Sequence, residues 1–348
     1  MLRVGIVGAT GYSGVELIRL LSNHPGARVH RLYSSSAEGA ELAAMFPHVS
    51  HMALPKLETI DPVAIMEDND VVFLATPSGV SASLTPKLLQ QSAKTKVIDL
   101  SGDFRLQSPD AYKQWYKKEP ASQDELHKAV YGLHEWNAEQ VANAQLVANP
   151  GCYPTATLLA LLPLAKTGWV DPSSWIIDAK SGVSGAGRGV SLGVHYSEVN
   201  ENFAAYKVAN HQHVPEIEQE LNRQTASEML VQFTPHLVPM TRGIFVTAYA
   251  KLNQSTTKEQ LQSLYETTYA DKPFVRVREF GSYPRTKDVY GTNLCDIAVH
   301  VDERTGRVIL LSVIDNVVKG AAGQAIQNMN TMFGLGETVG LPLAPLFP

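Results

Sequence analysis

A short β-branched strand runs directly into a glycine turn in Arg3-Val4-Gly5-Ile6-Val7-Gly8-Ala9-Thr10-Gly11-Tyr12-Ser13-Gly14. Apolar residues at helical spacing follow, from Val15 to Leu21. Strand, glycine turn and helix in this order favour dinucleotide binding, because the glycines allow a close backbone approach and the helix N-terminus faces a pyrophosphate. A glycine turn needed only for packing is the alternative. The candidate cofactor-binding residues here are Gly8, Thr10, Gly11, Tyr12, Ser13 and Gly14.

The second predicted strand, Ala27 to Tyr33, bears on which dinucleotide binds. It ends in Ser34-Ser35-Ser36 and lacks the acidic residue that would bind an NAD ribose. A phosphorylated ribose fits better, with Ser34 and Ser36 as donors to a 2′-phosphate. No arginine follows before Arg105, and a plain polar loop is the other interpretation. The sequence thus predicts NADP as the cofactor.

Further apolar runs predict the rest of a parallel, doubly wound sheet. Val71 to Pro77 is a run of the kind that is buried on both faces of such a sheet, and Thr76 and Pro77 at its end are cofactor candidates. The loop Ser101 to Arg105 lies at a carboxyl strand end, where α/β sheets bind ligands, so Arg105 is a candidate anion clamp or else a surface charge. The other expected elements are a helix in 80–91, a strand in 97–100 and a connection without clear period in 110–128.

The most reactive candidate is Cys152, in Ala148-Asn149-Pro150-Gly151-Cys152-Tyr153-Pro154-Thr155-Ala156-Thr157. A strand from Leu146, an Asn-Pro-Gly turn and a proline suited to a first helical turn place the thiol at a helix N-terminus. The helix dipole favours the thiolate there, and the thiolate is the nucleophilic form. A buried cysteine that packs as a small apolar residue is the alternative.

Beyond Cys152 the pattern changes to an α+β domain on a largely antiparallel sheet. Helices are expected near 215–224 and 258–269, and a small-residue helix follows Asp315, with Asn316 at its opening. The expected strands are Trp175 to Lys180, Met229 to Leu237, Gly243 to Leu252, Phe274 to Phe280, Leu294 to Val301 and Arg307 to Ile314.

Three polar clusters in this region are candidate site residues. The serine and glycine loop Ser181 to Gly189 offers backbone N–H groups to an anion, with Arg188 adding charge, and its Ser181 and Gly182 are cofactor candidates. His211 and His213 precede a helix, and one of them can be the acid/base partner of a thiolate. A metal pair is the rival, but no third ligand stands at a recognisable spacing. Arg242 at a strand start is a substrate clamp or a surface charge.

Length and charge narrow the class of protein. The 348 residues suit two domains, and the net charge of −5 without a basic run argues against nucleic acid and anionic membrane surfaces. The 2 cysteines support neither a disulfide framework nor a zinc site. No apolar stretch suits a signal peptide or a membrane span. We expect a cytoplasmic protein that acts on small molecules.

The sequence resembles the N-acetyl-gamma-glutamyl-phosphate reductases of arginine biosynthesis, which are relatives of aspartate-semialdehyde dehydrogenase. The resemblance covers the whole chain, and two departures from it are Gln212 in place of an arginine and the missing arginine after Tyr33. The segments that carry it are Gly8 to Gly14, Ser101 to Arg105, Asn149 to Thr155, Ser181 to Arg188, His211 to Glu216 and Asp315 to Gln324.

The resemblance implies a fold like that of glyceraldehyde-3-phosphate dehydrogenase. Residues 1–148 and 316–348 would form an NADP-binding Rossmann domain, and 149–315 a catalytic and oligomerisation domain. Cys152 would form a thioester with the acyl group and release phosphate, NADPH would reduce the thioester, and His213, or else His211, would act as acid/base. Asn316 would touch the nicotinamide, and the residues implied to bind substrate are Arg105, Asn149, Arg188, Glu216 and Arg242.

The resemblance also implies a homo-oligomer and no metal. Three other functions remain open at this point. The first is the same chemistry on an aspartyl or aminoadipyl phosphate. The second is a nucleotide sensor without catalysis. The third is a thiol hydrolase using Cys152 and His213, against which the glycine turn argues.

Overall fold

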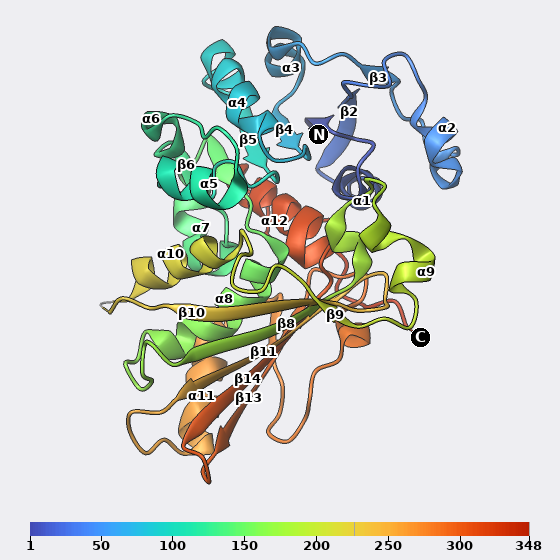
Figure 1. Cartoon of the computed structure of the whole chain (residues 1–348). Coiled ribbons are helices and arrows are strands. Elements are labelled where there is room, and N and C mark those ends of the chain that lie inside the picture. The colour runs from blue at the N-terminus through green and yellow to red at the C-terminus, as the bar shows by residue number, and fades with distance from the viewer. Residues whose placement is uncertain (226, 348) are drawn as a thin grey trace. The chain divides into compact units, whose positions relative to one another are not determined.

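The computed structural model describes residues 1–225 and 227–347. The chain divides into two compact units, one made of Met1–Pro150 with Ala321–Leu341 and the other of Gly151–Gly320 with the C-terminal residues from Pro342. Each unit is built on its own seven-stranded sheet (Figure 1).

The sheet of the first unit is parallel throughout, with the strand order β3-β2-β1-β4-β5-β7-β6. Its central strand β4 is buried along its whole length, as the apolar run predicted. The expected doubly wound α/β domain is confirmed. The strands are β1 (Leu2–Val7), β2 (Ala27–Tyr33), β3 (Leu57–Glu58), β4 (Val71–Leu74), β5 (Lys96–Asp99), β6 (Ala129–Tyr131) and β7 (Leu146–Ala148).

Two short helices of this unit begin at caps that are recognisable in the sequence. The prediction of a connection in 110–128 is wrong, because two helices lie there: Ser108 caps the first, and Ser122 with Glu125 forms a capping box at the second. The helices are α1 (Tyr12–Leu21), α2 (Leu42–Met45), α3 (Pro62–Asp68), α4 (Val80–Gln91), α5 (Pro109–Tyr116), α6 (Gln123–Leu126), α7 (His134–Asn143) and α12 (Gly323–Met332).

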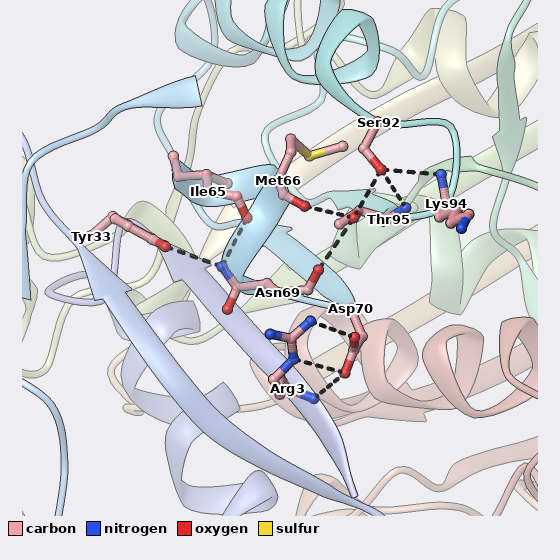
Figure 2. Close-up of polar contacts among 9 residues, drawn as sticks. All are labelled: Arg3, Tyr33, Ile65, Met66, Asn69, Asp70, Ser92, Lys94 and Thr95. Carbon is pink, nitrogen blue, oxygen red and sulfur yellow. Dashed lines mark hydrogen bonds and ion pairs between the residues drawn. The ribbon is translucent and has the colours of Figure 1, made fainter. Parts of the chain in front are cut away.

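Buried polar side chains tie the strand ends of this sheet together (Figure 2). The Asn69 amide donates to the Tyr33 hydroxyl and to the Ile65 carbonyl, at 3.0 and 2.9 Å. The Thr95 hydroxyl donates to the Met66 carbonyl at 2.9 Å. These bonds lie at the C-terminus of α3 and fix the start of β4 and β5. The loops that follow these two strands contain Thr76 and Arg105.

The sheet of the second unit has the order β12-β13-β14-β11-β8-β10-β9 and is largely antiparallel, with β8·β10 and β12·β13 as its parallel pairs. This agrees with the predicted α+β domain. The expected strand from Phe274 to Phe280 shortens to three residues. The strands are β8 (Trp175–Ser181), β9 (Ala204–Ala205), β10 (Val231–Leu237), β11 (Ile244–Lys251), β12 (Val275–Val277), β13 (Cys295–Asp302) and β14 (Arg307–Ile314).

Helices cover one face of this sheet. The strand β8 alternates between buried and more exposed residues, as the period of two predicted. Helix α8 packs on β11 and β14, and α10 packs on α8. From Tyr153 to Ala165 every residue of α8 is buried, which explains its apolar sequence. The helices are α8 (Cys152–Ala165), α9 (Tyr196–Val199), α10 (Val214–Gln224) and α11 (Lys258–Tyr269).

The segment after β14 differs from the expected helix that opens at Asn316. Asp315 accepts hydrogen bonds from the backbone N–H groups of Val317 and Val318, at 2.9 and 3.1 Å. A π-helix, Val318–Ala322, then precedes α12. Asn316 therefore lies ahead of the helical residues, because Asp315 caps the turn from which they start.

Candidate active site

The glycine turn after β1 has the geometry that a dinucleotide pyrophosphate needs. Gly8 has a φ of +87°, and a Cβ there would lie 2.4 Å from the Ala75 carbonyl oxygen. A Cβ on Gly14 would lie 2.5 Å from the Gly8 oxygen, so the turn packs tightly against the start of α1. Gly11 is the N-cap of α1 and supplies no side-chain cap, which leaves the helix N-terminus suited to an anion. These residues fit a dinucleotide.

The other cofactor candidates of the first unit lie at the ends of β2 and β4. Ser34 is buried, and its hydroxyl accepts from the Ser36 backbone N–H at 3.3 Å, while Ser36 itself is exposed. The Thr76 hydroxyl lies 3.1 Å from that of Ser81 at the start of α4. Pro77 accepts a hydrogen bond from Val80 and so begins the same helix. These ends join the carboxyl edge of the parallel sheet, where ligands of such sheets bind.

Arg105 and Asn149 are held together in the first unit. The Arg105 guanidinium donates to the Asn149 and Leu100 carbonyls, at 2.8 and 2.9 Å, and only 7% of the residue is exposed. The alternative that Arg105 is a surface charge is therefore wrong. The Asn149 amide donates to the Ala321 carbonyl at 3.1 Å and so ties the segment before Cys152 to the start of the C-terminal part of this unit.

Cys152 is the first residue of α8, as predicted. Gly151 is the N-cap without a side-chain cap, so the thiol lies at the positive end of the helix dipole. A carboxylate from α10 fixes this turn, because Glu216 accepts a hydrogen bond from the Gly151 backbone N–H at 2.8 Å. Glu216 is fully buried. On the other side, Gly320 of the π-helix packs so closely that its Cβ would lie 2.7 Å from that of Cys152.

The two histidines lie in contact ahead of α10. Their ring centroids are 4.7 Å apart, and His213 is the N-cap residue of the helix. The His213 backbone N–H donates to His211 Nδ1 at 3.2 Å, which places the proton of a neutral His211 on Nε2. Burial, and then the charge of Lys207, lowers the pKa of His211 to about 3. His211 is therefore neutral at pH 7.

A cavity of about 700 Å³ in the second unit brings the nucleophile and both histidines together. Ser181 and Gly182 line the same cavity, and Ser181 is buried. Tyr153 and Tyr206 line it too: the Tyr206 hydroxyl donates to that of Tyr153 at 3.3 Å. Burial raises the pKa of both phenols, of Tyr206 to about 12, so both are neutral donors. A site of this size accommodates a small acyl substrate.

The remaining candidates of the second unit lie outside the lining of this cavity. Arg188 is exposed, in the loop after the 3₁₀ turn Val183–Ala186. Arg242 lies 3.6 Å from the buried Asp315 and is not a simple surface charge. The Asn316 side chain accepts from the Gly243 backbone N–H at 2.7 Å and donates to the Ser184 hydroxyl at 2.9 Å. These bonds join the Ser181 loop to the start of β11.

Several residues of the cavity were not singled out from the sequence, among them Tyr153, Tyr206 and Lys207. Tyr153 adjoins the cysteine in the quoted stretch, and its aromatic ring contacts both histidines, with centroids at 5.6 and 6.0 Å. Tyr206 and Lys207 stand just before His211, and a loop that precedes two candidate histidines was the available signal. Within residues 1–225 and 227–347, no group of three or more metal-binding side chains is found, and no helix can span a membrane.

Known proteins are similar to this chain in sequence and in fold. Residues 3–144 match the model of the semialdehyde dehydrogenase NAD binding domain, and residues 152–316 that of the semialdehyde dehydrogenase dimerisation domain. The solved structure of aspartate semialdehyde dehydrogenase II from Vibrio cholerae superimposes with a TM-score of 0.73 at 18% identity, over 96% of this chain and 99% of that one. The first unit is thus a nicotinamide-dinucleotide domain of the semialdehyde dehydrogenase class.

Two curated relatives are far more similar in sequence. N-acetyl-gamma-glutamyl-phosphate reductase from Brevibacillus brevis is 68% identical over 100% of both chains. The protein of the same name from Bacillus subtilis is 53% identical, also over 100% of both chains. The chain therefore belongs to the N-acetyl-gamma-glutamyl-phosphate reductase family.

Proposed function

We propose that the protein reduces N-acetyl-γ-glutamyl phosphate to N-acetylglutamate semialdehyde and phosphate with NADPH, a step of arginine biosynthesis. The observation that carries this proposal is one cavity that holds a cysteine at a helix N-terminus beside two histidines. Relatives at 68% and 53% identity bear the name of this activity. Reactions on aspartyl or aminoadipyl phosphate, nucleotide sensing and thiol hydrolysis lack such support.

Cys152 is the nucleophile in this proposal. The thiolate attacks the acyl carbonyl, a tetrahedral oxyanion forms, and phosphate leaves as the thioester is made. Backbone N–H groups at the α8 N-terminus stabilise the oxyanion, since a helix N-terminus favours negative charge. Glu216 holds the Gly151 N–H, so we assign to it the positioning of this turn.

His213 is the acid/base in this proposal. It takes the thiol proton and passes it to the tetrahedral oxygen of the hemithioacetal. It then takes that proton back as the C–S bond breaks, the aldehyde carbonyl forms and the Cys152 thiolate leaves. The neutral His211, whose Nδ1 accepts from the His213 backbone N–H, fixes the loop that carries it. A pKa near 3 makes His211 a weak base at pH 7, so it is poorly suited to take the thiol proton.

The glycine turn would hold the cofactor pyrophosphate, and Ser34 and Ser36 would donate to the 2′-phosphate of NADP. When bound, the nicotinamide supplies the hydride that reduces the thioester. Thr76, Pro77, Ser181, Gly182 and Asn316 complete the proposed cofactor contacts. The glycine turn supports the proposed position of the pyrophosphate, because the tight packing leaves no room for a Cβ at Gly8 or Gly14.

Arginines and amides would orient the substrate. We assign Arg105, Asn149, Arg188 and Arg242 to its anionic and acetamido groups. In this proposal residues 1–148 and 316–348 make most of the cofactor contacts, and 149–315 carry the chemistry and the contacts of a homo-oligomer. The two compact units differ from these bounds, since residues 316–320 and those from Pro342 belong to the second unit. The match of residues 152–316 to a dimerisation domain supports the oligomer. A cytoplasmic location suits a catalytic thiol, which has to stay reduced.

The reverse reaction tests the proposal with stable reagents. Purified protein is given N-acetylglutamate semialdehyde, phosphate and either NADP or NAD, and reduced nucleotide is followed by absorbance. We expect phosphate-dependent turnover with NADP, slower turnover with NAD, and little turnover with aspartate semialdehyde. Equal rates with the two aldehydes would contradict the assigned substrate. Release of phosphate from the acyl phosphate in the absence of any nucleotide, measured separately, would favour the hydrolase.

A further inference from the structure

The Cys152 cavity has one permanent cation in its wall. Among the described residues that line it, Lys207 is the only lysine or arginine and Glu198 is the only carboxylate. The pKa of His211 is lowered to about 3, so its ring adds no charge at neutral pH. The substrate of the proposed function has two anionic groups, a carboxylate and a phosphoryl group. A cavity that accepts it needs a cation in contact with at least one of them.

The Lys207 ammonium is positioned by one hydrogen bond and still has N–H groups that can bind a ligand. Its Nζ donates to the Gln212 side-chain oxygen at 2.9 Å. An ammonium has three N–H donors, so two remain for a ligand. No ion pair of Lys207 is found in residues 1–225 and 227–347, and a neutral glutamine leaves its charge intact. An arginine at position 212 would repel this lysine, whereas the Gln212 side chain accepts a hydrogen bond from it.

The backbone around Lys207 is strained. Lys207 has a φ of +44° and Ala209 a φ of +54°, in the left-handed region that non-glycine residues rarely adopt. The Asn210 backbone N–H donates to the Lys207 carbonyl at 3.0 Å and closes this turn. Strain of this kind persists where the surrounding structure enforces it, and it is concentrated at ligand clamps and active sites. The Lys207 ammonium lies close to the two histidines, because it bonds to Gln212, which stands between them in the chain, and lines the same cavity.

We propose that Lys207 binds an oxyanion group of the substrate and that Gln212 positions its ammonium for this. The inference rests on the proposed function for the nature of the substrate. The shared chemistry is a carboxylate or phosphoryl oxygen that accepts two N–H groups of the ammonium. Lys207 is then a specificity residue of the cavity, a role that the sequence did not suggest.

The reverse reaction separates the two anionic groups, because the semialdehyde carries the carboxylate and phosphate is added by itself. The KM for the semialdehyde and the KM for phosphate are measured for Lys207→Met and for wild type, at saturating NADP. We expect a rise of roughly 10- to 100-fold in one KM, the range of a charge-assisted hydrogen bond, with kcat and the other KM nearly unchanged. A rise in the KM for the aldehyde identifies the carboxylate, and a rise in the KM for phosphate identifies the phosphoryl group.

Two variants guard against a merely structural effect. Lys207→Arg keeps the charge and should recover most of the affected KM. Lys251→Met removes an exposed lysine at the end of β11 and should leave both constants at the wild-type value. Gln212→Leu removes the acceptor of the ammonium and should raise the same KM as Lys207→Met, by a smaller factor.

The proposal is overturned if both KM values of Lys207→Met stay within about twofold of wild type. It is also overturned if Lys207→Arg is as impaired as Lys207→Met, because charge is then not what matters. If Lys207→Met does not fold, the KM values of Lys207→Arg and Gln212→Leu decide in the same way. Failure of the proposed function is a different result, since the wild type itself would then show no phosphate-dependent oxidation of the semialdehyde.

Discussion

The Glu216 carboxylate accepts a hydrogen bond from the Gly151 backbone N–H at 2.8 Å, with the carboxylate fully buried. This contact joins α10, which His213 caps, to the turn that presents Cys152. Nucleophile and proposed acid/base are therefore held by one buried bond between two helices. A carboxylate in this place binds the N-cap residue of α8, where the helix dipole favours negative charge.

We predict that Glu216→Ala lowers both stability and activity. A buried donor without its acceptor costs about 1 to 3 kcal/mol, and the Cys152 turn loses its link to α10. Glu216→Gln keeps an acceptor oxygen and should be closer to wild type in both measures. Urea unfolding and steady-state kinetics provide the measurements.

Glu220→Gln is the matched control for Glu216. Glu220 is also buried on α10, one turn later, and forms an ion pair with Arg223 at 3.1 Å. Its loss should lower stability without a change in kcat. If Glu216→Ala behaves in the same way, with full activity per folded molecule, Glu216 does not position the nucleophile.

Gly320→Ala should displace the nucleophile. The added Cβ would lie 2.7 Å from the Cys152 Cβ, closer than real Cβ atoms approach, and 3.1 Å from its Cα, which is a tight contact. Overpacking of this kind costs about 1 to 3 kcal/mol, and we expect a fall in kcat of at least roughly 10-fold because the thiol moves. Alkylation of Cys152 by iodoacetamide, followed by mass spectrometry, reports the displacement directly.

Gly336→Ala provides the comparison, because its Cβ would meet no atom closer than 3.5 Å. It should retain the wild-type rates of turnover and alkylation. Wild-type kinetics in Gly320→Ala would mean that the π-helix can move away from Cys152 at no cost to the reaction.

Much of this fold follows from local sequence signals. The strand Ala27–Tyr33 and the helix Val80–Gln91 have the bounds that apolar periodicity and turn residues predicted. The helices in 109–126 were missed because they are short, with 8 and 4 residues, and mostly polar. Their caps were nevertheless readable: Ser108 followed by a proline, and the box of Ser122 and Glu125.

The site was predictable in its reactive residues but not in the contacts that hold them. Cys152 was recognisable because the strand, turn and helix around it are each predicted by residues close to it in the sequence. The partners of Gly151 and Cys152, namely Glu216 and Gly320, lie 65 and 168 residues further along the chain. Such contacts depend on how α10 and the π-helix pack on α8, which no local pattern contains. Lys207 was missed because an exposed lysine in a loop has no distinctive pattern.

Cys152→Ser should separate binding from chemistry. A serine hydroxyl fills nearly the same space but is a much weaker nucleophile than a thiolate, so nearly all reduction should be lost. The glycine turn of the first unit is untouched, and NADPH affinity, measured by its fluorescence, should stay at the wild-type value. Cys295→Ser, at a buried cysteine of β13, should keep its activity. Substantial turnover by Cys152→Ser would contradict the thioester mechanism.

His213→Asn and His211→Asn should differ in their effect on the pH profile of kcat/KM. We expect His213→Asn to lower the rate by roughly 10²-fold and to flatten the profile near neutral pH, because the general acid/base is gone. His211→Asn should keep the shape of the profile. The opposite result, with the profile flattened by His211→Asn alone, would assign the acid/base to His211.

Stability should fall with acid because of His211. Its pKa is about 3 in the folded chain, lowered by burial and then by the charge of Lys207, against the ordinary value of 6.5 for an exposed imidazole. The unfolded chain therefore binds the proton more readily, and stability present above pH 6.5 is lost as the pH falls toward 3, by an amount on the order of several kcal/mol. Urea unfolding from pH 7 to 4 should show a smaller loss of unfolding free energy in His211→Asn than in wild type.

His195→Asn, which removes an exposed imidazole of the same unit, is the control and should lose stability with acid as wild type does. Parallel curves for wild type and His211→Asn would mean that His211 is not buried as a neutral ring, and its role in fixing the loop of His213 would have to be abandoned.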